Sequence, residues 1–203
     1  MRRARIATLG VPLDDALPAW VGAMVVLALH AATCSRSLSA FDSAELALAA
    51  YQGGLAHPPG HALHTLLGWI VTRGPGEPLF VLSLLSSVPA ALAAFPVLSI
   101  AEAMTRRTRA REARWMGAIV FVCLSMHAAV WEPATRVEVY TLAGLLCLFA
   151  FSWIAEIRAR AEGGSDTDGA SAAATAQAAM GWRAPAVAGA ALGLATGANV
   201  ALA

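Results

Sequence analysis

The sequence is poor in charged residues and contains no lysine. Only 13% of its 203 residues are charged, whereas a soluble domain of ordinary composition has about 25%. Because 58% of the residues are hydrophobic, too few polar side chains remain to cover a water-facing surface. All basic residues are arginines that gather in clusters and form no continuous stripe, which excludes nucleic acid as a partner. The composition predicts a membrane protein.

Cysteine is also scarce, and its placement excludes two further classes of protein. The three cysteines, Cys34, Cys123 and Cys147, form no CxxC pair. They are too few and too far apart for a disulfide framework or a thiolate metal site. Two of them lie inside apolar runs, where a thiol acts as a small hydrophobic group. We interpret all three as packing residues.

Long apolar runs, by contrast, are abundant. A helix that crosses a bilayer needs about 20 mostly apolar residues. Runs of this kind, bounded by charge or tryptophan, predict an all-α polytopic transmembrane bundle of about five membrane helices. They lie at 17–34, 79–104, 115–131, 139–157 and 184–203. Because the last run continues to Ala203, we expect the chain to be the N-terminal part of a longer protein.

The shorter apolar stretch at 61–72 indicates the orientation of the bundle. A length of about 10 to 14 residues is typical of an interfacial or re-entrant segment and not of a membrane span. If this stretch does not cross, Arg36, Arg73 and Arg136 face one side and every other arginine faces the opposite side. Arginine collects on the cytoplasmic side of membranes. The N-terminus is therefore predicted to be cytoplasmic, in a bacterial inner membrane.

This orientation divides the chain into parts. Residues 1–16 are expected to form a cytoplasmic tail, and 17–203 a membrane domain with an external loop at 35–78 and a cytoplasmic linker at 158–183. The first residues also match a signal peptide, with arginines before an apolar run. Because no small-x-small cleavage site directly follows that run, we favour an uncleaved anchor.

Two acidic residues of the external loop, Asp42 and Glu45, are three positions apart. The Ala and Leu content of 43–51 predicts a helix on which both carboxylates point to one face. One interpretation is structural, with Asp42 as the helix N-cap and an acid in the first turn. The other is functional, as a general base or a metal ligand at the membrane boundary. The sequence leaves both open.

Histidines follow in the same loop at His57, His61 and His64. Pro58 and Pro59 break any continuous helix, so only His61 and His64 are expected to share a helical face. A zinc site, substrate contacts and ordinary interfacial histidines are all compatible with this spacing. No metal site is indicated by the sequence, and a requirement for a divalent metal stays open.

A second external loop holds Arg136 and Glu138 beside the membrane. They are either solvated loop charges or part of a site, because charges close to a membrane also mark sites. An arginine facing outward is suited to hold a phosphate group through paired N–H donors.

Several of these segments resemble a family of membrane proteins similar to protein O-mannosyltransferases, within the GT-C glycosyltransferase group. The resemblance covers about 41–203. It rests on the runs Asp42-Ser43-Ala44-Glu45-Leu46, Gly54-Leu55-Ala56-His57-Pro58-Pro59-Gly60-His61, Trp131-Glu132-Pro133-Ala134, Glu138-Val139-Tyr140-Thr141-Leu142 and Gly193-Leu194-Ala195-Thr196-Gly197-Ala198-Asn199.

This resemblance implies a GT-C-like fold and a transferase that moves a sugar from a polyprenyl-phosphate donor to a hydroxyl of a protein or glycan acceptor, with inversion, outside the cytoplasm. It assigns Asp42 as catalytic base and Glu45 as its support. The substrate-binding residues would be His57, Pro58, Pro59 and His61 on the donor side, with Glu138 and Tyr140 on the opposite wall. We add the hypothesis that Arg136 or His57 stabilises the departing lipid phosphate.

The chain departs from that family in size, since such enzymes have about twice as many spans and usually a soluble external domain. Two other functions therefore stay open. A transporter or channel subunit would need ionisable residues deep inside the spans. Only His30 and His127 approach this depth. A noncatalytic membrane scaffold would use the abundant small residues for helix packing.

Overall fold

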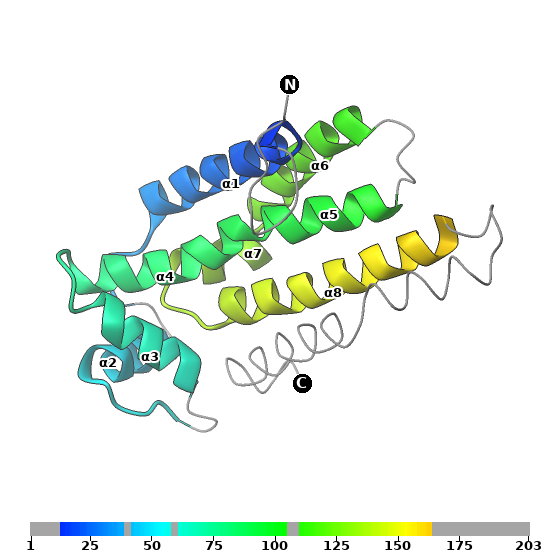
Figure 1. The fold of residues 1–203 in the computed structure, drawn as a ribbon. Coiled ribbons are helices and arrows are strands. Elements are labelled where there is room, and N and C mark those ends of the chain that lie inside the picture. Colours follow the sequence, from blue (N-terminus) through cyan, green and yellow to red (C-terminus); the bar gives the residue numbers. More distant parts are fainter. Residues whose placement is uncertain (1–12, 39–41, 58–60, 105–109, 164–203) are drawn as a thin grey trace.

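The structure is a computed structural model that describes residues 13–38, 42–57, 61–104 and 110–163. This part of the chain is helical throughout and contains no strand, which confirms the predicted all-α membrane bundle (Figure 1). The helices are α1 (Leu13–Thr33), α2 (Ser43–Gln52), α3 (Ala62–Val71), α4 (Pro78–Leu92), α5 (Ala94–Met104), α6 (Ala110–Ser125), α7 (Ala128–Thr135) and α8 (Tyr140–Gly163).

Three segments of the described chain are long and apolar enough to cross a membrane. They are Ala16–Thr33 in α1, Pro78–Met104 in α4 and α5 together, and Tyr140–Arg158 in α8. Helix α3 is apolar but has only ten residues, too short to span. The predicted span at 184–203, most of the linker and most of the N-terminal tail lie outside the described residues.

The predicted span at 115–131 falls on a broken pair of helices, α6 and α7, which together are long and apolar enough for a broken span or a re-entrant loop. Helix α6 ends at Ser125, α7 begins at Ala128, and the two axes are bent by 72°. His127 causes the restart, because its backbone is extended and its imidazole accepts a hydrogen bond from the Ala129 N–H at 3.3 Å. His127 is thus the N-cap of α7.

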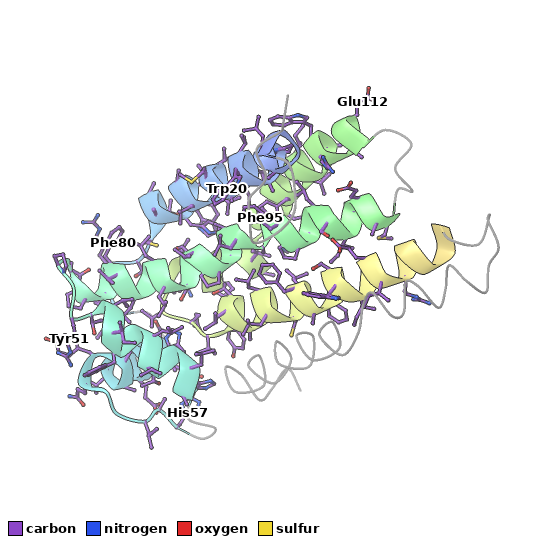
Figure 2. The ribbon with its side chains drawn as sticks, in the orientation of Figure 1. Trp20, Tyr51, His57, Phe80, Phe95 and Glu112 are labelled. Carbon is purple, nitrogen blue, oxygen red and sulfur yellow. The ribbon has the colours of Figure 1, made fainter. Side chains whose placement is uncertain are left out.

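Small residues allow the long helices to pack closely. Buried alanines such as Ala23, Ala94 and Ala118 join α1, α5 and α6 around Val26 and Phe121. The rings of Trp20 and Phe95 meet edge to face at 4.9 Å beside this core (Figure 2). At one end, the Arg114 guanidinium binds the Glu102 carboxylate through two hydrogen bonds of 2.7 and 3.1 Å, which joins α6 to α5.

Helices α2 and α3 lie together at the opposite end of the bundle, beside the start of α4 (Figure 1). A second core holds them there. Leu46 and Ala50 of α2 are buried with Leu82 of α4 and with Val137 and Val139, which precede α8. Burial of a Leu or Val side chain contributes about 1.5 to 3 kcal/mol. This core fixes the predicted external loop against the membrane helices.

Gly68 permits the close approach of α3 to its neighbours. A Cβ atom at this position would lie 2.6 Å from the Ala50 Cβ and 2.9 Å from a Leu82 methyl carbon. Real Cβ atoms do not approach other heavy atoms so closely, so α3 would have to move away.

We expect Gly68→Ala to destabilise the docked α2 and α3 helices by about 1 to 3 kcal/mol, a typical cost of overpacking. Limited proteolysis of the loop between α2 and α3 in native membranes measures this loss. Gly144→Ala in α8 is the matched control, because its Cβ would meet no atom within 4 Å. Equal protease resistance of the two variants would contradict the proposed role of Gly68.

Candidate functional site

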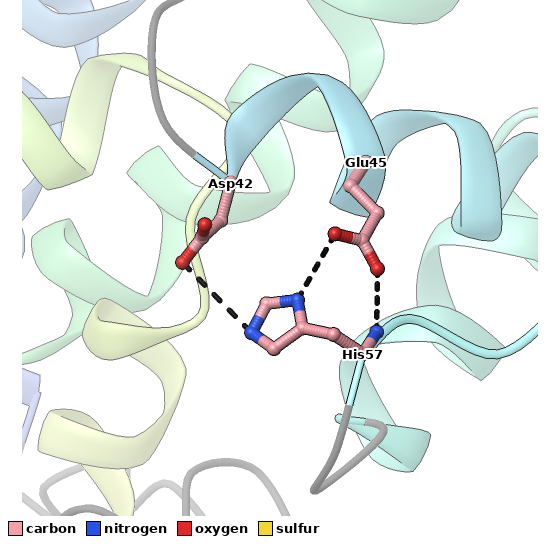
Figure 3. Close-up of polar contacts among 3 residues, drawn as sticks. All are labelled: Asp42, Glu45 and His57. Atoms are coloured by element: carbon pink, nitrogen blue, oxygen red, sulfur yellow. Dashed lines mark hydrogen bonds and ion pairs between the residues drawn. The ribbon is translucent and has the colours of Figure 1, made fainter.

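Helix α2 presents its two acidic residues on one face, as the sequence predicted. Asp42 occupies the N-cap position, but its carboxylate makes no capping hydrogen bond. Its Oδ2 lies instead 3.9 Å from Nε2 of His57 (Figure 3). Asp42 and Glu45 thus take the N-cap and first-turn positions of the structural interpretation, but the Asp42 carboxylate is not used in a capping hydrogen bond.

His57 lies between the two carboxylates (Figure 3). Its backbone N–H donates to Oε1 of Glu45, and its Nδ1 lies 3.1 Å from Oε2 of the same carboxylate. The hydrogen bond from the His57 backbone, followed by that from its ring, lowers the pKa of Glu45. Glu45 is thus a carboxylate at neutral pH, and it anchors both the backbone and the ring of His57.

The next two histidines extend the cluster inward. His61 precedes α3 in a left-handed conformation, with φ of 43°, and its ring meets that of His57 edge to face at 5.6 Å. A left-handed residue other than glycine is strained, and such strain gathers at functional sites. His64 is 1% exposed in the first turn of α3. Pro58 and Pro59, predicted to contact substrate, lie outside the described residues.

The segment between α7 and α8 lies close to this cluster. Val137 and Val139 are buried in the core that also holds α2, and Glu138 lies between them. Burial raises the pKa of Glu138, and the nearby Asp42 charge raises it further, whereas Arg136 and His61 oppose this. Glu138 therefore faces the cluster on α2 and α3.

The outer members of this loop are more exposed. The Arg136 guanidinium is 3.9 Å from the Glu132 carboxylate, one turn earlier on α7, and is 38% exposed. Tyr140 is the first residue of α8, and about half of its side chain is exposed. No group of three His, Cys, Asp or Glu side chains in the described ranges has the geometry to hold a metal ion.

A serine inside α4 fixes Glu138, and sequence reasoning missed it. The Ser86 hydroxyl donates to the Glu138 carbonyl at 2.9 Å and accepts from the Glu138 N–H at 3.0 Å. Ser86 is 1% exposed. The signal was present in the sequence, because Ser83, Ser86 and Ser87 recur at helical spacing inside an otherwise apolar run.

The other two serines fix the remaining loop backbones. The Ser83 hydroxyl donates to the Ser35 carbonyl at 3.0 Å, just after α1. The Ser87 hydroxyl donates to the Ala134 carbonyl at 2.7 Å, near the end of α7. One face of α4 therefore holds the outer ends of two other helices.

We expect Ser86→Ala to destabilise the protein by about 1 to 3 kcal/mol, because it removes both hydrogen bonds of the Glu138 backbone in a buried place. Thermal unfolding of the detergent-solubilised chain measures the change. Ser99→Ala is the control, since the Ser99 hydroxyl bonds Glu156 at an exposed position. A loss no larger than that of the control would contradict the role of Ser86.

His64 predicts an acid-sensitive fold. Burial, with a smaller contribution from His61, lowers the pKa of His64 to about 4, and no described residue bonds its Nε2. Because the unfolded chain binds the proton more tightly, the native state is favoured above pH 6.5 and loses up to roughly 3 kcal/mol as the pH falls to 4. His64→Leu should remove this part of the pH dependence in thermal unfolding measured between pH 7 and 4. An unchanged slope would contradict it.

One comparison with known proteins finds a matching family model. The family model described as the protein O-mannosyl-transferase TMEM260 N-terminal domain matches residues 42–201, which begin at Asp42 and include every residue of the cluster. No curated protein and no solved structure gives a significant match. The match spans well over half of the chain and agrees with the resemblance that the sequence motifs indicated. The chain therefore belongs to the family of protein O-mannosyltransferase N-terminal domains.

Proposed function

We propose that this chain provides the membrane-embedded transfer site of a GT-C-type mannosyltransferase. It takes a sugar from a polyprenyl-phosphate donor and passes it to a hydroxyl of a protein or glycan acceptor. The observation that carries the proposal is the carboxylate of Asp42, which stands at the start of α2, is not used as a cap, and has His57 beside it. The family assignment supports the sugar and the reaction class.

The charge distribution supports an extracytoplasmic location of this site. Arg36, Arg73 and Arg136 lie at the end of the bundle where α1 and α7 finish and α4 begins. Glu112 lies at the opposite end from His57 (Figure 2), next to the run of arginines at 106–114. Because arginine collects on the cytoplasmic side, the end with His57 faces outward and the N-terminus is cytoplasmic.

Each residue of the site then has a role in one displacement. Asp42 removes the proton of the acceptor hydroxyl, and the acceptor oxygen bonds to the anomeric carbon. The bond from that carbon to the phosphate oxygen breaks with inversion, and the electron pair stays on the phosphate. Arg136 is suited to stabilise this phosphate. Its guanidinium is partly exposed, and its contact with the Glu132 carboxylate is long, at 3.9 Å.

The remaining residues shape the substrate sites. His61, together with Pro58 and Pro59, forms the donor side, and Glu138 and Tyr140 form the opposite wall. Glu45 supports Asp42 through His57. His57 is a poor phosphate ligand in this arrangement, because both of its ring nitrogens face carboxylates that repel an anion.

An exposed apolar surface beside the site suits the lipid part of the donor. Leu55 is 83% exposed, Leu66 55%, Ile70 53% and Trp69 41%. These side chains cluster on α3 and on the loop before it. Large apolar side chains exposed next to membrane spans contact lipid in place of water.

The test is transfer of radiolabelled mannose from polyprenyl-phosphate mannose in membranes that express the complete reading frame containing this chain. We expect Asp42→Asn to lower kcat by about 100-fold or more, the usual contribution of a general base. Arg136→Ala should lower turnover by roughly tenfold or more, through loss of phosphate stabilisation.

Glu112→Gln and Arg158→Ala are the controls, because both residues are exposed. Glu112 lies at the opposite end from His57 (Figure 2), and Arg158 lies near the C-terminal end of α8, far from Tyr140 at its start. Protein levels and protease resistance are matched across all variants. Normal turnover of Asp42→Asn would contradict the assignment of the base. Absence of transfer from any polyprenyl donor in the unmodified protein would contradict the function itself.

A further inference from the structure

We propose that His57 is a proton relay for Asp42, oriented by Glu45. The inference rests on the proposed function and deepens it. In this arrangement, Asp42 alone touches the acceptor hydroxyl, and His57 carries the proton onward from the carboxylate. His57 is therefore a positioning and relay residue and not a group that contacts the sugar.

Glu45 determines which ring nitrogen of His57 can accept a proton. Its carboxylate is within 3.1 Å of Nδ1, which therefore bears the hydrogen and donates it. Its other oxygen accepts from the backbone N–H of the same residue, so the ring cannot easily turn away. The lone pair of Nε2 then points toward Asp42. A carboxylate that fixes an imidazole tautomer in this way is the arrangement found in catalytic triads.

The distance from Nε2 to Oδ2 of Asp42 is 3.9 Å. This exceeds a direct hydrogen bond, and one bridging water or a small approach of either side chain closes it. Hydrogen bonds of a catalytic group are often long before substrate binds. The proton of the acceptor hydroxyl moves to Asp42 as the oxygen bonds to the anomeric carbon, and from Asp42 to Nε2. Asp42 is then a carboxylate again, and His57 is an imidazolium.

Charged and titratable groups face His57 from each element packed against it. Asp42 and Glu45 lie beside it at the start of α2, and the His61 ring meets it edge to face from the start of α3. Glu138, from the segment before α8, interacts with Asp42, Arg136 and His61. One carboxylate therefore lies at each ring nitrogen of His57, as a relay between Glu45 and Asp42 requires.

The experiment compares His57→Gln and Glu45→Gln with Glu112→Gln in the mannose transfer assay. Glu112→Gln is the matched control for Glu45→Gln, because it makes the same substitution at an exposed residue at the opposite end from His57 (Figure 2). We expect His57→Gln to lower kcat by roughly 100-fold with an unchanged donor KM, since proton transfer contributes about 10²- to 10⁴-fold.

The separate effects on kcat and KM distinguish a relay from a structural role. A relay residue acts after the donor has bound, so His57→Gln should lower kcat and leave the donor KM unchanged. Glu45→Gln should lower kcat in the same way, because His57 loses the carboxylate that fixes its tautomer. A raised donor KM with an unchanged kcat in His57→Gln would overturn the relay.

A second variant covers the case in which His57→Gln fails to fold. His57→Ala keeps the backbone N–H that binds Glu45 and leaves space for free imidazole. Added imidazole should restore at least a tenth of the lost turnover in this variant and none in Asp42→Asn. No rescue in a protein that is present and protease-resistant would contradict the relay, whereas absence of transfer in the unmodified protein would contradict the proposed function instead.

Discussion

The hydroxyls of Ser83, Ser86 and Ser87 are the interaction on which the rest of this structure depends. Backbone groups in an apolar environment need hydrogen-bond partners, because leaving one unpaired costs several kcal/mol. The ends of α1 and α7 and the turn into α8 all carry such groups, and the serines of α4 bond one or more in each place. A purely apolar α4 would leave these connections without partners. Helix α4 is therefore both a candidate membrane helix and the support of the segments that follow α1 and α7.

The chemistry of the site follows from this frame. Ser86 fixes the backbone of Glu138, and Val137 and Val139 on either side of it enter the same core as Leu46 of α2. The helix that carries Asp42 and Glu45 is thereby placed opposite Glu138. His57 then joins the two carboxylates of this helix, with its backbone N–H and Nδ1 at Glu45 and its Nε2 toward Asp42.

Much of this arrangement could be predicted from the sequence, and the failures have physical causes. Run length and arginine clusters indicate membrane helices, and the spacing of Asp42 and Glu45 indicates their shared face. The break after α6 was not predicted, because a single histidine does not interrupt an apolar run. His127 acts through a local hydrogen bond, which composition does not reveal. The bonding of Ser86 to Glu138 joins residues 52 positions apart, and no local pattern reports such a pairing.

The bend between α6 and α7 also determines how far this part of the chain reaches. A straight helix would carry the ten residues from Ser125 to Thr135 about 15 Å farther along the α6 axis, at 1.5 Å a residue. Because of the 72° bend, α7 runs sideways instead and packs against α1 and α4. The Thr135 carbonyl can then accept from the Ser35 N–H at 2.8 Å. The bend therefore places Arg136 directly beside the segment that follows α1.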